Sequence, residues 1–115
     1  MVVDMLSEDE VDRLFQALAD ATRRDIVARV LIAEYSVSGL AEQYDMSFAA
    51  VQKHVAVLER ASLVTKERRG REQIVRGQVD GVQKARRLLD EYEEIWRQRV
   101  DRITDILAAD AQDED

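Results

Sequence analysis

The stretch from Ser36 to Arg76 constrains the fold more than any other part of this 115-residue sequence. Two short helical patterns, each preceded by a serine suited to an N-cap, are expected over Val37 to Tyr44 and from Phe48, with Asp45-Met46 as the turn between them. Two strand-like runs then flank the tip Glu67-Arg68-Arg69-Gly70-Arg71, whose glycine supplies the positive φ that a tight hairpin requires. This order predicts a mainly α domain with a small β-hairpin.

The second of these helical patterns, Phe48 to about Arg60, has one apolar face and one free face. Val51, Val55 and Leu58 recur at i, i+4 and i+7 and therefore face the core. At about 100° per residue, the opposite side and its flanks carry Ala49, Ala50, Gln52, Lys53, Ala56 and Arg60. Small residues with one amide and one ammonium let a helix approach the DNA major groove closely, although such positions are also typical of a solvated helix. Together with the basic hairpin tip, this face predicts a winged helix-turn-helix.

The net charge of −7 argues against a nucleic-acid partner only if the charge is spread evenly. It is zoned instead: residues 1–20 carry −5, residues 21–76 carry +3 and residues 77–115 carry −5. Within the middle zone, residues 47–76 alone carry +4. Because exposed charges are screened beyond about 8 Å at physiological salt, the basic zone acts separately from the acidic ends. Local charge therefore favours double-stranded DNA as a partner.

Two further helices are expected from caps and apolar spacing. Ser7 and Glu10 form a capping-box pattern ahead of a first helix that runs to Ala19. Asp20 or Thr22 caps a second helix, whose inward face is expected to carry Ile26, Val27, Val30 and Leu31.

Four side chains near these helices each have two interpretations. Arg23 and Arg24 oppose the dipole of the second helix, a cost that a bound phosphate offsets; alternatively they are simply solvated. His54, the single histidine, is expected to pack or cap at the edge of the buried stripe, with a phosphate or groove contact as the alternative. Phe48 is expected to pack against the preceding helix rather than to wedge between bases.

From Asp80 to Leu107, apolar residues recur at spacings of three and four and predict one helix on the order of 38 Å long. Such a helix protrudes from a small domain, so its apolar stripe needs a partner, and a homodimer is the favoured solution. Folding back over the chain's own core, or a ligand pocket around Tyr92 and Trp96, are the alternatives. The expected interface residues are Leu14, Leu88, Leu89, Tyr92, Ile95, Trp96, Val100 and Ile103.

The expected organisation is a single domain over residues 1–115. A DNA-binding core covers residues 7–78, a dimerisation helix covers residues 80–107, and an acidic, frayed tail covers residues 108–115.

Composition narrows the function further. The chain has no cysteine, which excludes disulfides and thiolate metal sites and fits a reducing, cytoplasmic location. Met1 to Leu6 lacks the features of a targeting segment, and no apolar run approaches the length of a membrane span. No nucleophile accompanies the lone histidine, and no glycine-rich phosphate loop is present, so we expect neither an enzyme nor a cofactor.

The motifs resemble those of the ArsR family of bacterial winged-helix repressors. The resemblance is carried by Leu18-Ala19-Asp20-Ala21-Thr22-Arg23-Arg24-Asp25-Ile26, by Leu40-Ala41, by Val51 to Leu58 with its His-x-x-x-Leu spacing, by Leu63-Val64 and by Arg69-Gly70-Arg71. It covers roughly residues 11 to 78. It implies a dimer that binds a palindromic operator and represses transcription, with the fourth helix in the major groove and the hairpin as the wing.

Departures from the family pattern concern metal sensing and operator choice. Where metal-sensing members carry Cys-Val-Cys, this chain reads Ser36-Val37-Ser38, and the last helix has no histidine for a zinc site. Since hydroxyls are poor ligands for soft or borderline ions, we expect no metal site, as in metal-free members of the family. Ala21 replaces the usual proline, and Gln52 replaces a frequent serine or threonine, which leaves the operator bases undetermined.

The leading hypothesis is a homodimeric, sequence-specific transcriptional regulator that acts as a repressor. Its expected DNA-binding residues are Arg23, Ser47, Ala49, Ala50, Gln52, Lys53, His54, Arg68, Arg69 and Arg71. The alternative is a winged-helix protein-interaction module that does not bind DNA. Whether a small-molecule effector acts on the protein is left open by the sequence.

Overall fold

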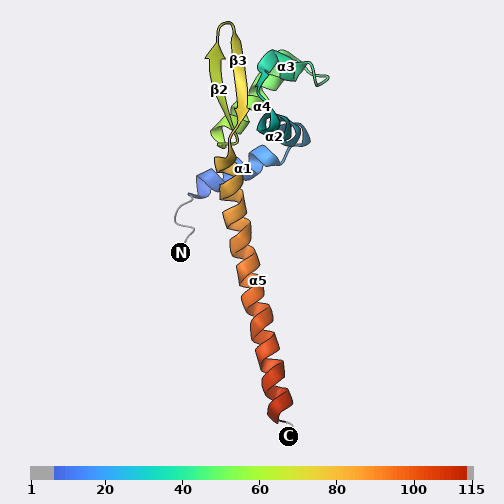
Figure 1. Cartoon of the computed structure of the whole chain (residues 1–115), viewed down its shortest axis with the longest axis vertical. Helices are drawn as coiled ribbons and strands as arrows, with labels where there is room; N and C mark the ends of the chain where they lie inside the picture. The colour runs from blue at the N-terminus through green and yellow to red at the C-terminus, as the bar shows by residue number, and fades with distance from the viewer. Residues whose placement is uncertain (1–6, 114–115) are drawn as a thin grey trace. The chain divides into compact units, whose positions relative to one another are not determined.

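A computed structural model describes residues 7–113, so the expectation about Met1 to Leu6 lies outside the described residues. Contacts divide the chain into two compact units, with the division after Ala85. A small antiparallel sheet accompanies the helices, as the sequence predicts. In chain order the elements are α1 (Glu8–Leu18), α2 (Ala21–Ile32), β1 (Tyr35–Ser36), α3 (Val37–Ala41), α4 (Phe48–Arg60), β2 (Val64–Arg69), β3 (Glu72–Gly77) and α5 (Val79–Asp113) (Figure 1).

Four helices begin where short polar side chains satisfy a free backbone N–H. The side chains of Ser7, Asp20, Ser36 and Ser47 each accept a hydrogen bond from the N–H three residues further on, at 2.9–3.1 Å. Such a cap stabilises a helix by about 0.5–2 kcal/mol relative to alanine. The predicted caps are confirmed, and of the two alternatives for α2 it is Asp20 that caps.

The core of the first unit is formed by α1 to α4 together with the sheet. The predicted stripe of α4 is confirmed, since Val51, Val55 and Leu58 are all 0% exposed. The prediction for α2 is wrong at Leu31, which is 48% exposed. Leu31 lies against Gly77 at the end of β3 instead, where an added Cβ would come within 2.8 Å of the Leu31 Cα.

The sheet has the strand order β1-β3-β2, and both pairs are antiparallel. In the hairpin, Val64 pairs with Gly77 and Arg69 with Glu72, so Gly70 and Arg71 form the tip. Gly70 has a φ of 65°, as the predicted tight turn requires. The short strand β1, which pairs with β3, was not predicted, because a strand of two residues has no periodicity to detect.

Two helix ends differ from the prediction. The helix α3 ends at Ala41 rather than Tyr44, and beyond its end the Tyr44 hydroxyl donates to Asp25 of α2. The helix α5 continues through the stretch 108–113 that was expected to fray. Ala108, Ala109 and Ala111 explain the continuation, since alanine has the highest helix propensity.

Candidate nucleic-acid interface

The free face of α4 lies at the N-terminal half of the helix. Ala49, Gln52 and Lys53 are exposed, and Ala50 is half-buried. Ser47, which is also exposed, caps the helix by accepting from the Ala50 N–H at 3.1 Å. Because the opposite face is fixed in the core, this small-residue surface has one defined orientation on the first unit.

Arg23 and His54 support the helices beneath this face. The Arg23 guanidinium donates to the carbonyl oxygens of Ala17 and Gln16, both at 2.8 Å, and its Nη1 lies 3.3 Å from His54 Nδ1. Arg24 likewise donates to a carbonyl at the end of α1. These contacts fall on carbonyls of the last turn of α1, where intrahelical partners run out, and the Gln16 carbonyl also accepts from the Ala19 N–H at 3.2 Å. Neither interpretation offered for Arg23 describes this arrangement, because its side chain is only 18% exposed and bonded within the chain.

A cluster of three side chains holds the turn between α3 and α4 against α2. The Tyr44 hydroxyl and Arg29 Nε both donate to Asp25 Oδ2, and the Arg29 guanidinium stacks 5.7 Å from the centre of the Tyr44 ring. Burial, and then the hydrogen bond to Asp25, raise the pKa of Tyr44 to about 12. The bonds from Tyr44 and Arg29 lower the pKa of Asp25. Sequence reasoning missed this cluster, since Asp25 and Tyr44 are 19 residues apart.

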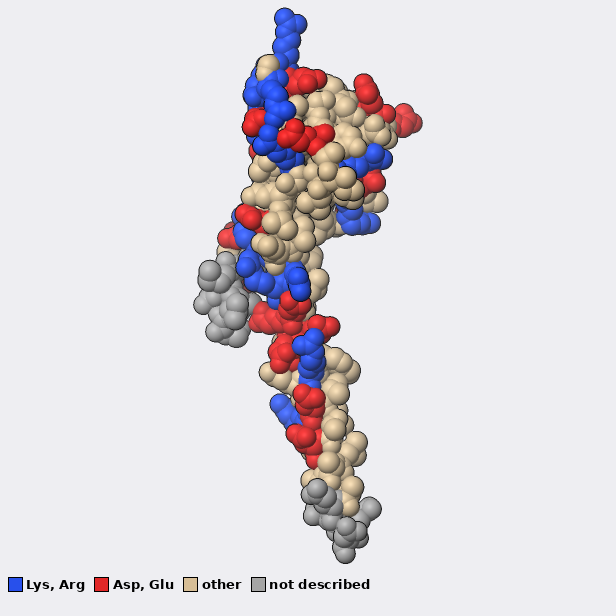
Figure 2. Space-filling model, viewed as in Figure 1, with Lys and Arg blue, Asp and Glu red and all other residues tan. Residues whose placement is uncertain are grey.

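The hairpin tip carries two basic side chains that remain available for an anion. Arg68 Nε donates to the Gly70 carbonyl oxygen at 3.2 Å, and Arg71 is exposed. Within residues 7–113 neither arginine pairs with a carboxylate. In Figure 2 basic atoms stand alone at the end of the hairpin, whereas acidic and basic atoms lie side by side further down.

One face of the hairpin carries Glu67, Arg69 and Arg76, which together with Glu34 form a cluster of two acidic and two basic side chains that we call the wing-face cluster. Arg69 lies 3.2 Å from Glu34 Oε1 and 2.8 Å from Glu67 Oε1. Arg76 contacts the same two carboxylates, through Glu34 Oε2 and Glu67 Oε1. Bonds from Arg76 and Arg69 lower the pKa of Glu34, and bonds to Glu67 and Glu34 raise that of Arg69. Arg69, expected to hold phosphate, is therefore already paired.

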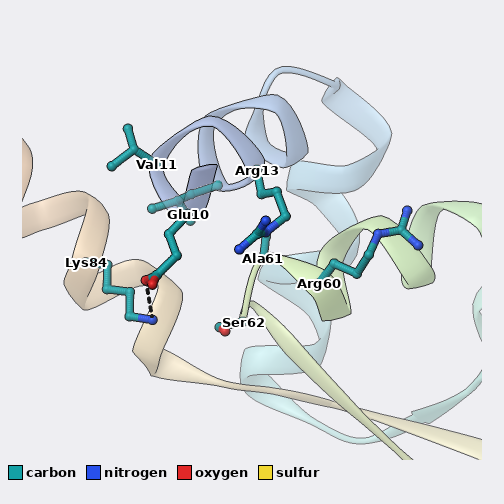
Figure 3. A pocket seen from close by; sticks show the side chains of 8 residues that line it. Glu10, Val11, Arg13, Arg60, Ala61, Ser62 and Lys84 are labelled. Carbon is teal, nitrogen blue, oxygen red and sulfur yellow. Dashed lines mark hydrogen bonds and ion pairs between the residues drawn. The ribbon is translucent and has the colours of Figure 1, made fainter. Parts of the chain in front are cut away.

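A pocket of about 170 Å³ lies at the other end of α4, between α1 and the first turns of α5 (Figure 3). Glu10 and Lys84 form an ion pair across its edge at 3.3 Å, and Arg13 and Arg60 also line it. It lies at the opposite end of α4 from the Ser47 cap, so it takes no part in the candidate interface.

Beyond Ala85, α5 exposes an apolar stripe along the second unit. Six residues of the stripe are between 38% and 60% exposed: Leu89, Tyr92, Ile95, Trp96, Val100 and Ile103. Leu88 is half-buried. Tyr92 and Trp96 are each 59% exposed, so a single chain does not enclose them in a ligand pocket. Leu14, which we also expected at a dimer interface, is only 3% exposed and packs inside the core of the first unit.

Comparisons with known proteins agree with this arrangement. Residues 20–66 match the family model described as "Bacterial regulatory protein, arsR family". The HTH-type transcriptional regulator Rv2034 of Mycobacterium tuberculosis is 37% identical over 81 residues, which cover 70% of this chain and 76% of that protein. The chain belongs to the ArsR family. It is therefore a transcriptional regulator with a winged helix-turn-helix DNA-binding fold and not an enzyme.

Solved structures of this family share the fold. An ArsR-like transcriptional regulator from Rhodococcus sp. RHA1 is 31% identical, with a TM-score of 0.78 over 88% of this chain and 93% of that chain. The Mycobacterium bovis protein Mb0332, a possible ArsR-family regulator described as a homodimeric winged helix-turn-helix DNA-binding domain, is 24% identical. Its TM-score is 0.60 over 75% of this chain and 80% of that chain, which is evidence for a common fold. Among residues 7–113, no helix has the length and apolar character to cross a membrane.

Proposed function

We propose that this ArsR-family regulator is a homodimer that binds a palindromic DNA operator and represses transcription. The observation that carries the proposal is the pairing, on one compact unit, of an exposed small-residue face of α4 with a hairpin tip whose Arg68 and Arg71 contact no carboxylate among the described residues. In this proposal Ala49, Ala50, Gln52 and Lys53 face base edges. Ser47, Arg68 and Arg71 contact the phosphate backbone.

The exposed stripe of α5 supports the homodimer. A stripe that includes Trp96 and Ile95, each about three-fifths exposed, is unusual on a monomer and becomes buried when two chains pair. Twofold symmetry then presents two copies of α4 to DNA. We expect half-sites about 10–10.5 bp apart, or a multiple of that spacing, because each α4 must reach the major groove on the same side of the duplex.

We further propose that the protein does not sense metals through the sites known in its family. The Ser36 hydroxyl accepts a hydrogen bond from the Gly39 N–H at 2.9 Å, so this position serves as a helix cap. Hydroxyls at Ser36 and Ser38 supply none of the thiolate chemistry that soft metals prefer. Within the described residues no three His, Cys, Asp or Glu side chains are grouped to hold a metal ion. No small-molecule effector is assigned.

Selection from random genomic fragments, followed by sequencing, tests the proposal by revealing the operator. Enrichment of an inverted repeat supports it. Absence of any duplex binding at low salt would reject it and favour the protein-interaction module instead.

Two variants then separate base contacts from backbone contacts. Lys53→Ala should reduce the preference for the operator over scrambled DNA by about tenfold or more, as expected for a lost base contact. The double variant Arg68→Ala with Arg71→Ala should instead weaken all duplexes alike and reduce the salt slope by about one unit per lost phosphate contact. Unchanged discrimination in the first variant, or an unchanged slope in the second, would remove the role assigned to that region.

A further inference from the structure

The wing-face cluster connects the hairpin to a residue far away in the sequence. Glu34, between α2 and β1, is 35 residues from Arg69 and 42 from Arg76, yet it contacts both guanidinium groups. Each of its two carboxylate oxygens serves one arginine. A DNA phosphate offers the same chemistry, two anionic oxygens that accept from guanidinium N–H groups. Glu34 therefore occupies arginine donors that would otherwise be suited to the DNA backbone.

The cluster affects the charge of the hairpin more than its stability. Its four side chains are 44–51% exposed, and exposed ion pairs add little to the free energy of folding. The hairpin is held instead by its six paired positions and by the burial of Val64 and Val75. The two carboxylates neutralise Arg69 and Arg76, so the net positive charge of the hairpin lies mainly at its tip.

We propose that Glu34 is an internal counter-charge that competes with DNA phosphate for Arg69 and Arg76. This inference rests on the proposed DNA-binding function. When the hairpin contacts a duplex, Arg69 exchanges the Glu34 carboxylate for a phosphate oxygen. Because the ion pair with Glu34 is lost, the net free energy of DNA binding is less favourable. Because backbone contacts do not depend on base sequence, Glu34 lowers the affinity for operator and for unrelated DNA alike. It thereby limits how much protein is held on unrelated DNA.

The test compares the full-length wild type with Glu34→Gln on the selected operator and on a scrambled duplex, over a series of salt concentrations. We expect the variant to bind both duplexes about three- to tenfold more tightly at low salt, with an unchanged ratio between them. The slope of log affinity against log salt should steepen by about 0.9 for each arginine that gains a phosphate.

Glu72→Gln is the matched control. It removes the same charge from the hairpin itself, at a position that has no ion pair within the described residues. Its effect on affinity and slope should be clearly smaller. In an Arg69→Ala background the gain in affinity from Glu34→Gln should shrink, because one of the two arginines that Glu34 contacts is missing. If Glu34→Gln fails to fold, Glu34→Asp is the alternative variant, since its shorter side chain keeps the charge but moves the carboxylate away from Arg69 and Arg76. A smaller increase in DNA affinity is then expected.

Three outcomes would reject the role of Glu34 as a counter-charge. The first is an equal gain in DNA affinity from Glu34→Gln and from Glu72→Gln. The second is a gain in affinity from Glu34→Gln that is just as large in the Arg69→Ala background. The third is weaker DNA binding by Glu34→Gln than by the wild type. If the wild type binds a selected operator and any of these results is found, only the role of Glu34 is rejected. The proposed function is then still supported. If neither the wild type nor Glu34→Gln binds any duplex, both proposals fall.

Discussion

The two compact units of this chain differ in the exposure of their apolar side chains. In the first unit, residues such as Ile26, Leu40 and Leu58 are fully buried among α1 to α4 and the sheet. In the second unit, Leu89, Ile95 and Trp96 are more than half exposed along one helix. Apolar spacing alone therefore does not say whether a stripe meets its own chain or another. The first unit completes its core within one polypeptide, whereas the second leaves its apolar stripe exposed, and we propose that a second copy of the chain covers it.

Alanine substitutions in the two units should separate these modes of stabilisation. Leu58→Ala removes a side chain that is 0% exposed and should lower the free energy of unfolding by about 2–5 kcal/mol, through lost burial and the cavity left behind. This cost should not depend on protein concentration if the core is complete within one chain. Ile103→Ala, at a side chain that is 47% exposed, should instead lower stability through the dimer.

Denaturant unfolding at two protein concentrations a hundredfold apart measures both effects. The midpoint of Ile103→Ala should approach that of the wild type as the dimer population falls, since a partner that binds only the folded state stabilises by mass action. If Ile103→Ala has the same effect at every concentration, the distinction between the two units is wrong.

A charge placed in the stripe of α5 should break the dimer outright. Trp96→Glu puts a carboxylate where an aromatic side chain would be buried, and burial of an unpaired charge is strongly unfavourable. Sedimentation should show monomers at micromolar concentrations. Operator affinity should fall about 100-fold or more, because two linked half-site contacts become one.

Gln98→Glu is the matched control for this variant, since it adds the same charge two residues further along the helix, at a position outside the stripe. It should remain dimeric. A monomeric Trp96→Glu that still binds the operator with wild-type affinity would contradict the coupling between dimerisation and DNA binding.

The features that could be predicted from the sequence are those whose causes lie within a few residues. A cap such as Ser47 bonds to an N–H three residues on, and the stripe of α4 repeats every three or four residues. Both signals are visible in a single window of sequence, so the boundaries of α1, α2 and α4 are close to expectation. The exposed face of α4, which is simply the side away from the stripe, is predictable for the same reason.

The features that could not be predicted depend on partners far along the chain. Arg69 is recognisable as a basic residue at a hairpin tip, yet nothing near it indicates that Glu34 neutralises it. Arg23 likewise looks free for phosphate until His54 and the end of α1 are placed beside it. The sequence therefore identifies the basic segments, whereas the availability of each charge depends on tertiary contacts.

The smallest effect expected in this comparison belongs to the cap of α2, which lies wholly within the first unit. The Asp20 carboxylate accepts from the Arg23 N–H at 3.0 Å, and this hydrogen bond lowers the pKa of Asp20 below its usual 3.8. The unfolded chain therefore binds a proton more readily than the folded one. The stabilisation is complete above about pH 4 to 5 and is lost as pH falls through the lowered folded-state pKa.

Asp20→Ala should cost about 0.5–2 kcal/mol at neutral pH, and Asp20→Asn much less, because asparagine is also a good N-cap. Both variants should flatten the acid limb of the stability curve, since neither has a carboxyl group at position 20. Because the cap acts inside one unit, neither should change the dimer dissociation constant, which chemical denaturation and sedimentation between pH 3 and 7 would measure. A change in dimer affinity at neutral pH would show that the two units are energetically coupled through α2, and the contrast between them would then have to be given up.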